Sequence, residues 1–388
     1  MENLPSLAQM LSQVPDSRQP GKVEHPLTAL LLHAILAVLS GCRGPTAMAE
    51  WGRWHPELAM ELGYVTTVTP CAATFCRLFA ALEWTALVAV LRTWAEMWRP
   101  PRESSDASKA PPPDPVALDG KTYRGSRKRG GHRCHVLTAV FHELGLVWTE
   151  SAVDDKTNEI PVAKALLSPL CLRGRVVTMD ALLSQREIAK VILDGGGDYV
   201  MPIKENHKSV HREIHALFRD AKTLPVSLET AETVEKSRGR LEVRRLTAMS
   251  RTDEWGDGEF DAYFDGPGLR QVYRIEREVK VLRTGETSCE VEVGFTSLAP
   301  DRVGPDALLA YRRGHWHIEN GIHYVRDVTF DEDRSQVHRG NAPQVHGTIR
   351  NLAIALCRRH DRTNIARACR EIAANPRLVL PWVGVTPS

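Results

Sequence analysis

The chain has 388 residues, of which 43% are hydrophobic and 25% are charged, and its formal net charge is +2. This length provides for two or three domains with a sizeable core, and the composition is ordinary for a globular protein. The nearly neutral balance excludes a partner recognised through bulk charge alone, so local clusters of charge carry more information than their sum.

Residues 1–98 are expected to form a helical N-terminal domain. The opening is polar, is interrupted by prolines and has no signal-peptide pattern. Residues 27–42 are the most apolar stretch, but they are fewer than the roughly 20 residues that a membrane span needs, and His33 interrupts them. This favours a buried helix over a membrane segment and predicts a cytoplasmic protein. Further helices are expected after Gly44 and over residues 76–97.

Residues 99–115 are predicted to be a linker, because proline, serine and charge dominate and large apolar side chains are absent. A second domain is predicted over residues 116–374, followed by a tail at 375–388. Within it, residues 225–298 alternate apolar and charged side chains, as half-exposed strands do, which indicates a β-rich insertion. The remaining pattern indicates an α/β fold with a mixed sheet and helical cover. The expected elements are strands at 116–119, 136–141, 147–153, 176–180 and 199–203, helices at 155–167 and 184–193, and further helices from 306 to about 374.

The eight cysteines are scattered, and none form a C-x-x-C pair. This is typical of thiols in a reducing cytosol. A zinc site on Cys71 and Cys76, or on Cys134 with His132 and His135, is the weaker alternative, because no second ligand pair lies at zinc spacing.

Three carboxylates stand out as candidate metal ligands. Asp119 and Asp180 each end a short apolar run, VALD and VVTMD, and two adjacent strand ends can bring carboxylates into one cleft. Glu319 lies in the segment YRRGHWHIENGIHYVRDVTFDED, which is predicted to be helical. Mg²⁺ takes oxygen ligands from one or two carboxylates, water and phosphate, and two such ions about 4 Å apart can serve phosphodiester chemistry. The alternative is that each aspartate only caps a turn or a helix.

Basic side chains cluster near these carboxylates. One face of the helix that carries Glu319 also presents Arg312, His315, His323 and Arg326 at helical spacing. The sequence after Asp119, KTYRGSRKRGGHR, is either a loop that holds phosphates or a solvated hairpin loop. The candidate DNA contacts are Lys121, Arg124, Arg127, Lys128, Arg129, Lys204, Arg238, Arg240, Arg312, Arg313, His315 and Arg326.

The histidines around Glu319 follow the order H-W-H-I-E-N-x-x-H, which does not match the H-E-x-x-H zinc motif. Contacts to phosphates or bases and a purely structural role both remain open for them. Trp316 is expected to pack the helix on the sheet, with a wedge that unstacks DNA as the alternative.

Several blocks together resemble the DDE transposases of the ISAs insertion-sequence family, which includes the H-repeat-associated proteins. The resemblance covers residues 14 to about 355 and keeps the order of the blocks. The blocks are DPVALDGKTYRGS, DDKTNEI, VVTMDALLSQREIA, GGDYVMPIKENH, RGRLEVRR and HWHIENGIHYVRDVTFDED, after an N-terminal segment DSRQPGKVEHPLTALLLHAILAVLSGCRG.

The resemblance implies a ribonuclease-H-like catalytic core with the β-rich insertion, preceded by an all-α domain that binds DNA ends or pairs protomers. It maps the catalytic and metal-binding triad to Asp119, Asp180 and Glu319, with two Mg²⁺ or Mn²⁺ ions. It implies that water cuts the element's end to free a 3′-OH, which then attacks target DNA. The expected partners are double-stranded DNA, as terminal repeats and target, and a second copy of the chain, in the bacterial cytoplasm.

The chain departs from the pattern of related transposases at two places. These carry Tyr, Arg and Lys around the glutamate, where this chain has Arg312, His315 and Arg326. After Lys204, Glu-Asn-His stands where Gly-Asn-Gln is expected. Two other functions stay open, namely a two-metal nuclease without strand transfer and a catalytically inactive DNA-binding relic.

Overall fold

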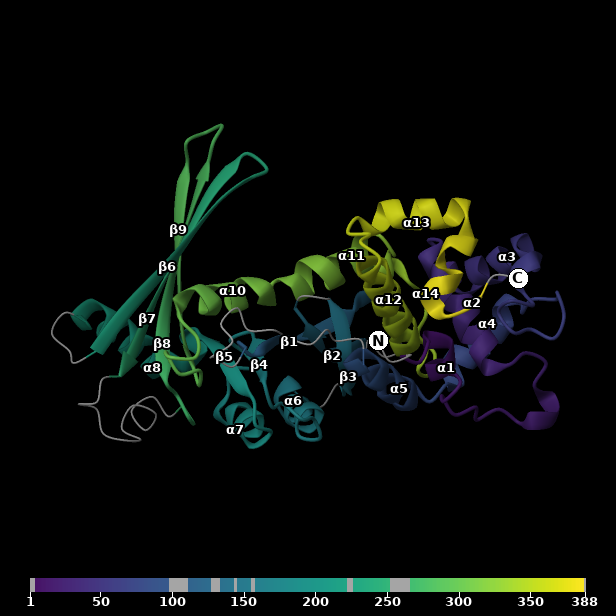
Figure 1. Ribbon diagram of the computed structural model, residues 1–388, viewed down its shortest axis with the longest axis horizontal. Helices are drawn as coiled ribbons and strands as arrows, with labels where there is room; N and C mark the ends of the chain where they lie inside the picture. The colour runs from purple at the N-terminus through teal and green to yellow at the C-terminus, as the bar shows by residue number, and fades with distance from the viewer. Residues whose placement is uncertain are drawn as a thin grey trace. The chain divides into compact units, whose positions relative to one another are not determined.

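A computed structural model describes residues 4–97, 111–126, 133–142, 145–154, 158–221, 226–251 and 266–386 (Figure 1). The predicted contacts Arg127, Lys128 and Arg129, and most of the predicted linker, lie outside these ranges. The chain forms two compact units that interleave along the sequence. The first contains residues 1–101, 120–158 and 317–388, and the second contains residues 102–119 and 159–316.

The first unit is mainly helical, and its N-terminal and C-terminal helices pack on one another. Helix α2 (Leu27–Leu39) contacts α12 (Ala342–Arg359) and α13 (Ile365–Ala374), and Figure 1 shows these purple and yellow helices side by side. Every residue of α2 except Thr28 is buried, which confirms the prediction of a buried helix. The other helices of the unit are α1 (Leu7–Leu11), α3 (Pro45–Trp54), α4 (Ala72–Ala81), α5 (Trp84–Met97), α11 (Tyr324–Val328) and α14 (Leu380–Val383).

The helical character predicted for the N-terminal region is confirmed, but the single helix over residues 76–97 is wrong. Two helices, α4 and α5, meet there at an angle of 85°. The chain turns because Leu82 adopts an extended conformation, with ψ 134°, and buries its side chain. No single helix within the described ranges is long and apolar enough to cross a membrane, although α4 and α5 would meet that criterion as a bent pair.

The strands of the first unit are β2 (Cys134–Phe141), β3 (Leu146–Val153) and the end of β1 (Asp114–Tyr123), in the order β3-β2-β1. Strands β2 and β3 are antiparallel. Helices α5 and α12 both contact β3, so the apolar side chains of this sheet are covered by helices.

The second unit is a mixed sheet with the strand order β1-β4-β5-β9-β8-β7-β6. Strands β1, β4 (Arg175–Met179) and β5 (Asp198–Ile203) are parallel. Helix α6 (Glu159–Leu167) leads from β3 into β4, and helix α7 (Arg186–Asp194) connects β4 to β5, as expected for parallel neighbours. The predicted strands and helices are therefore confirmed here, and α8 (Lys208–Asp220) is an additional helix.

The β-rich segment forms antiparallel strands that extend the same sheet beyond β5. These strands are β6 (Val226–Ser237), β7 (Arg240–Arg251), β8 (Gln271–Val281) and β9 (Thr287–Thr296), and β9 pairs with β5. Arg238 and Gly239 connect β6 to β7 with positive φ angles, as a two-residue hairpin turn requires.

Helix α10 (Pro305–His315) covers the sheet of the second unit. Leu308, Leu309 and Tyr311 are buried in one cluster with Val176 of β4 and Tyr273 of β8. Burying each large apolar side chain of this kind contributes about 1.5–3 kcal/mol. The packing fixes the face of α10 that carries Arg312 and His315 against the end of β4.

Candidate active site

Asp119 and Asp180 occupy neighbouring positions on two parallel strands of the second unit. Strand β1 pairs with β4 in register, up to Leu118 opposite Met179. Asp119 is the next residue of β1, and Asp180 is the residue that follows β4, so their backbones lie roughly 5 Å apart, the spacing of paired strands. Both are half-buried. The adjacent strands predicted from the sequence are confirmed, although β1 continues to Tyr123 and Asp119 therefore lies within it.

The turn after β4 fixes the carboxylate of Asp180. Its Oδ1 accepts a hydrogen bond from the Leu183 backbone N–H at 3.0 Å, and its carbonyl accepts one from Ser184 Oγ at 2.9 Å. Asn206 Nδ2 donates to the Ala181 carbonyl at 2.7 Å. The segment that follows Lys204 therefore holds the turn that carries Asp180.

Helix α10 places two of the predicted cationic residues beside Asp180. Arg312 Nη1 donates to the Met179 carbonyl at 3.1 Å, and Nε and Nη2 donate to Glu292 at 2.7 and 2.9 Å. Burial opposes its charge, but the attraction of Glu292 outweighs burial and raises the pKa of Arg312. The ring of His315 is 3.2 Å from Thr178 Oγ1. Both side chains are buried and contact residues at the end of β4.

Glu319 lies in the first unit, on an exposed turn of π-helix, Ile318–His323. Ile318 and Ile322 are buried and anchor this turn. A π-helix is uncommon and often occurs at functional sites, because the wider turn changes the direction of a side chain. Burial lowers the pKa of His323 to about 3, so this histidine is neutral. It therefore adds no positive charge to the helix face on which it was predicted to lie.

Arg326, predicted to contact DNA, is fully buried in the first unit. Its Nε and Nη2 donate to Glu332 at 2.9 Å each, and its guanidinium lies 4.4 Å from the centre of the Tyr123 ring. Arg350 donates to the same carboxylate at 2.7 Å. Burial would raise the pKa of Glu332, but the attraction of Arg326 and Arg350 outweighs burial and lowers it to about 2. The side chain therefore holds the fold around α11 instead of facing solvent.

The other predicted cations differ in accessibility. Lys121 is buried and pairs with Asp327 at 2.7 Å, and Arg313 pairs with Glu235, whose pKa this hydrogen bond lowers. Arg124 remains exposed despite its pair with Asp333 at 3.4 Å. Solvent also reaches Lys204 and the two arginines at the β6–β7 turn, Arg238 and Arg240.

No group of three or more His, Cys, Asp or Glu side chains among the described residues lies close enough to hold a metal ion. The donors of Asp119 and Asp180 are carboxylate oxygens, and Mg²⁺ is held by one or two carboxylates together with phosphate and water. The pair therefore fits the chemistry of a magnesium site. The alternative zinc site on Cys71 and Cys76 gains no support from the described residues, and His132 of the other alternative lies outside the described ranges.

The sequence did not predict the acidic partners of the arginines. These partners are Glu292 for Arg312, Glu235 for Arg313, and Glu332 for Arg326. The only local signal is that Glu332 lies six residues after Arg326 within DED, and the other two pairs join α10 to strands β9 and β6.

Comparison with known proteins decides the family. The model of the transposase DDE domain matches residues 105–357, more than half of the chain, and a DDE transposase-associated model matches residues 8–95. The chain belongs to the DDE transposase family. A solved structure that is similar to this chain is the piggyBac transposase synaptic complex with hairpin DNA. The TM-score is only 0.35 and the sequence identity 10%, over 99% of this chain and 82% of that one.

Curated relatives span nearly the whole chain. The H repeat-associated putative transposase YhhI of Escherichia coli (strain K12) is 29% identical over 355 residues, which cover 90% of each chain. The putative transposase YncI of Escherichia coli O157:H7 is 27% identical over 378 residues, which cover 95% of this chain and 89% of that one. The family predicted from the sequence blocks is thus confirmed.

Proposed function

We propose that the chain is an insertion-sequence transposase that binds the ends of its element and catalyses Mg²⁺-dependent DNA cleavage and strand transfer. The observation that carries the proposal is the pairing of β1 with β4, which sets Asp119 beside Asp180 in a member of the DDE transposase family. Glu319 is proposed as the third carboxylate. Magnesium, or manganese, would supply the positive charge that polarises the scissile phosphodiester and stabilises the charge that develops on it.

The chain's own residues would position and neutralise the DNA. Asp119 and Asp180 present oxygen donors from a rigid sheet, and Arg312 fixes the backbone that carries Asp180. Accessible cations, among them Arg124 and Lys204, would hold phosphate oxygens, which contributes to affinity but not to sequence recognition. Arg326 and His315, being buried, are proposed to position the site instead of touching DNA.

The finer description of the fold belongs to the same proposal. Three consecutive strands, β1 to β3, followed by the parallel strands β4 and β5 support a ribonuclease-H-like core interrupted by strands β6 to β9. We propose the domain division 1–98, 99–115, 116–374 and 375–388 for the whole chain. The helical N-terminal domain would bind DNA ends or pair two protomers on DNA.

The test is to incubate the full chain with duplex DNA that carries its own terminal repeats and Mg²⁺, and to map nicks and joined products. Asp119→Asn, Asp180→Asn and Glu319→Gln should each abolish cleavage while DNA binding persists, and chelation of the metal should do the same to the wild type. Glu187→Gln, an exposed change in the first turn of α7, is the control and should cut normally.

Three results would contradict parts of the proposal. Cleavage by Asp180→Asn at the wild-type rate would overturn the assignment of the site. Nicked ends that never join to a target would favour the nuclease alternative. DNA binding without any Mg²⁺-dependent product from the wild type would favour the inactive relic.

A further inference from the structure

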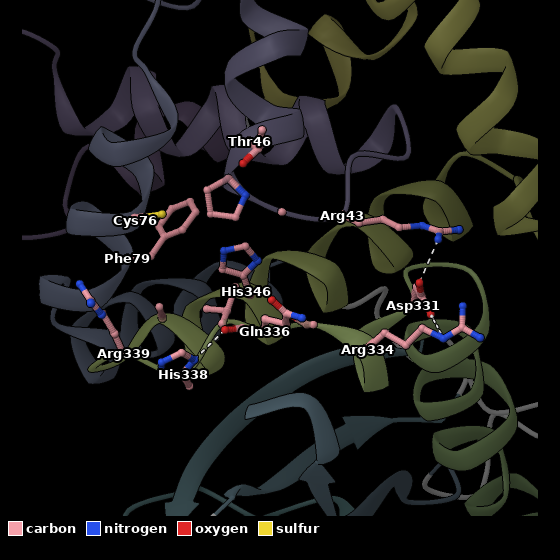
Figure 2. A pocket seen from close by; sticks show the side chains of 15 residues that line it. Arg43, Thr46, Cys76, Phe79, Asp331, Arg334, Gln336, His338, Arg339 and His346 are labelled. Carbon is pink, nitrogen blue, oxygen red and sulfur yellow. Dashed lines mark hydrogen bonds and ion pairs between the residues drawn. The ribbon is translucent and has the colours of Figure 1, made fainter. Parts of the chain in front are cut away.

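A cavity of about 510 Å³ lies within the first unit, and none of the three candidate carboxylates lines it. Its walls come from the start of α3, from α4, from residues 331–339 and from the start of α12 (Figure 2). The volume falls in the range of small-molecule sites. None of the roles proposed above uses it.

The inner wall of the cavity is apolar and aromatic. Phe79 and His346 meet edge to face, with their ring centroids 4.9 Å apart, and Pro45 and Val337 line the same space. Figure 2 shows the rings of Phe79 and His346 near one another. A planar ring is the kind of group that such a wall stacks against, and stacking tolerates any nucleobase.

His346 leaves one hydrogen-bonding atom unused at this wall. The side chain is 2% exposed, and its Nε2 has no hydrogen-bond partner among the residues that the structure describes. Burial lowers the pKa of His346 to about 3, so the ring is neutral and can donate from one nitrogen and accept at the other. A buried polar atom without a partner is costly, and a ligand with a polar ring edge would relieve that cost.

The cavity is lined by more basic than acidic side chains. Arg43, Arg334 and Arg339 line it against a single acidic residue, Asp331, which lies 3.0 Å from Arg43 and 3.7 Å from Arg334. The side chain of Arg339 makes no hydrogen bond or ion pair with any residue in the described ranges. The N-terminal ends of α3 and α12 also border the cavity, and the positive end of a helix dipole attracts anions.

We propose that this cavity binds a nucleotide, with the base against Phe79 and His346 and the phosphate at Arg339. An apolar wall with an unused polar atom explains the base, and an exposed arginine of the lining, Arg339, explains the phosphate. The nucleotide is either a free mononucleotide or an unpaired nucleotide of a DNA strand. Only the second source rests on the proposed transposase function.

Cys76 lines the cavity and gives a direct readout, because it is an exposed free thiol. The full chain is alkylated with iodoacetamide, and the rates at Cys76 and Cys71 are compared by mass spectrometry. Cys71 is an exposed free thiol that does not line the cavity and serves as the internal control. Deoxyadenosine monophosphate should slow alkylation of Cys76 alone, by about tenfold at roughly nine times its dissociation constant.

Two variants test the proposed contacts between the nucleotide and the cavity. Thr46→Trp places a large ring in the cavity from an exposed position and should abolish the protection. Arg339→Ala should weaken binding of the mononucleotide by about tenfold or more, as expected for a lost charge-assisted hydrogen bond. Arg283→Ala, an exposed arginine of the second unit, is the control and should leave the protection unchanged.

Protection by inorganic phosphate equal to that by the mononucleotide would overturn the proposal, as would equal protection by deoxyadenosine. The absence of protection by the mononucleotide and by single-stranded oligonucleotides would also overturn it. If a single-stranded oligonucleotide protects Cys76 and the fully paired duplex does not, the nucleotide comes from DNA. Protection by the mononucleotide alone supports a free nucleotide. Because DNA cleavage is not measured, failure here leaves the proposed active site untouched.

Discussion

Two arginines from the segment predicted as one helix, Arg313 and Arg326, enter networks of ion pairs that differ in burial. In the first unit Arg326 is fully buried with Glu332 and Arg350. In the second unit Arg313 pairs with Glu235 on β6, where both side chains are more than a third exposed. The sequence presents both arginines as alike, and only the structure separates them.

The free energy that is lost when an ion pair is broken depends on how deeply the pair is buried. A buried charge that loses its partner remains desolvated, which costs several kcal/mol. An exposed charge regains water and loses little. The buried network should therefore control whether the first unit folds, whereas the exposed pairs of β6 to β9 leave their arginines available for other contacts.

Glu332→Ala should show the largest effect on stability, because it leaves Arg326 and Arg350 buried without their shared counter-charge. The expected loss is about 3–5 kcal/mol in the free energy of unfolding. Urea denaturation of the full chain, followed by the fluorescence of its tryptophans, measures it. A change below about 1 kcal/mol would mean that the buried network is not held by this carboxylate.

Acidification should destabilise the first unit in particular. Burial lowers the pKa of His33 to about 4 and the pKa of His323 and His346 to about 3, from an ordinary 6.5. The unfolded chain then binds protons that the folded chain does not. The contribution of these histidines to the free energy of unfolding is therefore fully present above pH 6.5 and is lost as the pH falls below it. The loss is about 2 kcal/mol for each histidine by pH 5.

Glu332 adds a second loss at lower pH. Its folded pKa of about 2 lies below the ordinary 4.5, so its contribution to stability is present above pH 4.5 and disappears as the pH falls toward 2.

The loss that comes from the histidines is measured between pH 7 and pH 5. Amide hydrogen exchange at these two values, corrected for intrinsic rates, should show greater loss of protection in α2 and α12 than in α7 and β5. Equal losses in the two units would contradict this.

Gly347→Ala should disturb the buried network by crowding. A Cβ at this position would lie 2.5 Å from Tyr123 Oη and 2.7 Å from Arg326 Nη2. Overpacking of this kind costs about 1–3 kcal/mol. Gly21→Ala, where no atom lies within 4 Å of the new Cβ, is the matched control for the same measurement. Equal stability of the two variants would show that α12 moves to accommodate the methyl group.

Glu232→Ala should show the smallest effect. Its pair with Arg245 joins β6 to β7 between side chains that are 41% and 54% exposed. The expected change is below about 1 kcal/mol, and it should shrink further in high salt. A loss as large as that of Glu332→Ala would remove the distinction between the two networks.

Much of the fold could be predicted from the sequence. Alternation and apolar runs predicted the strands around Asp119 and Asp180, and the lengths of the apolar stretches predicted the buried α2. The break between α4 and α5 escaped prediction because one buried residue, Leu82, decides it through tertiary packing. The π-helix at Glu319 escaped because an ordinary helix has nearly the same residue pattern.

The candidate site could be predicted less completely. The position of each aspartate at the end of a short apolar run, VALD and VVTMD, predicted two neighbouring aspartates, since adjacent strand ends bring such residues together. The burial of Arg312, His315 and Arg326 could not be predicted, because it depends on Glu292, Thr178 and Glu332. The sequence around an arginine does not show whether a carboxylate from another element of the fold will form an ion pair with it.

The central claim is that Asp119, Asp180 and Glu319 share one metal site. Replacing Mg²⁺ with Fe²⁺ and adding ascorbate and peroxide generates hydroxyl radicals at the bound ion, which cut the nearby polypeptide. Mass spectrometry of the full chain on its terminal-repeat DNA should locate cuts next to all three carboxylates, and Asp180→Asn should remove them. Cuts near Asp119 and Asp180 with none near Glu319, or cuts that persist in Asp180→Asn, would contradict the account.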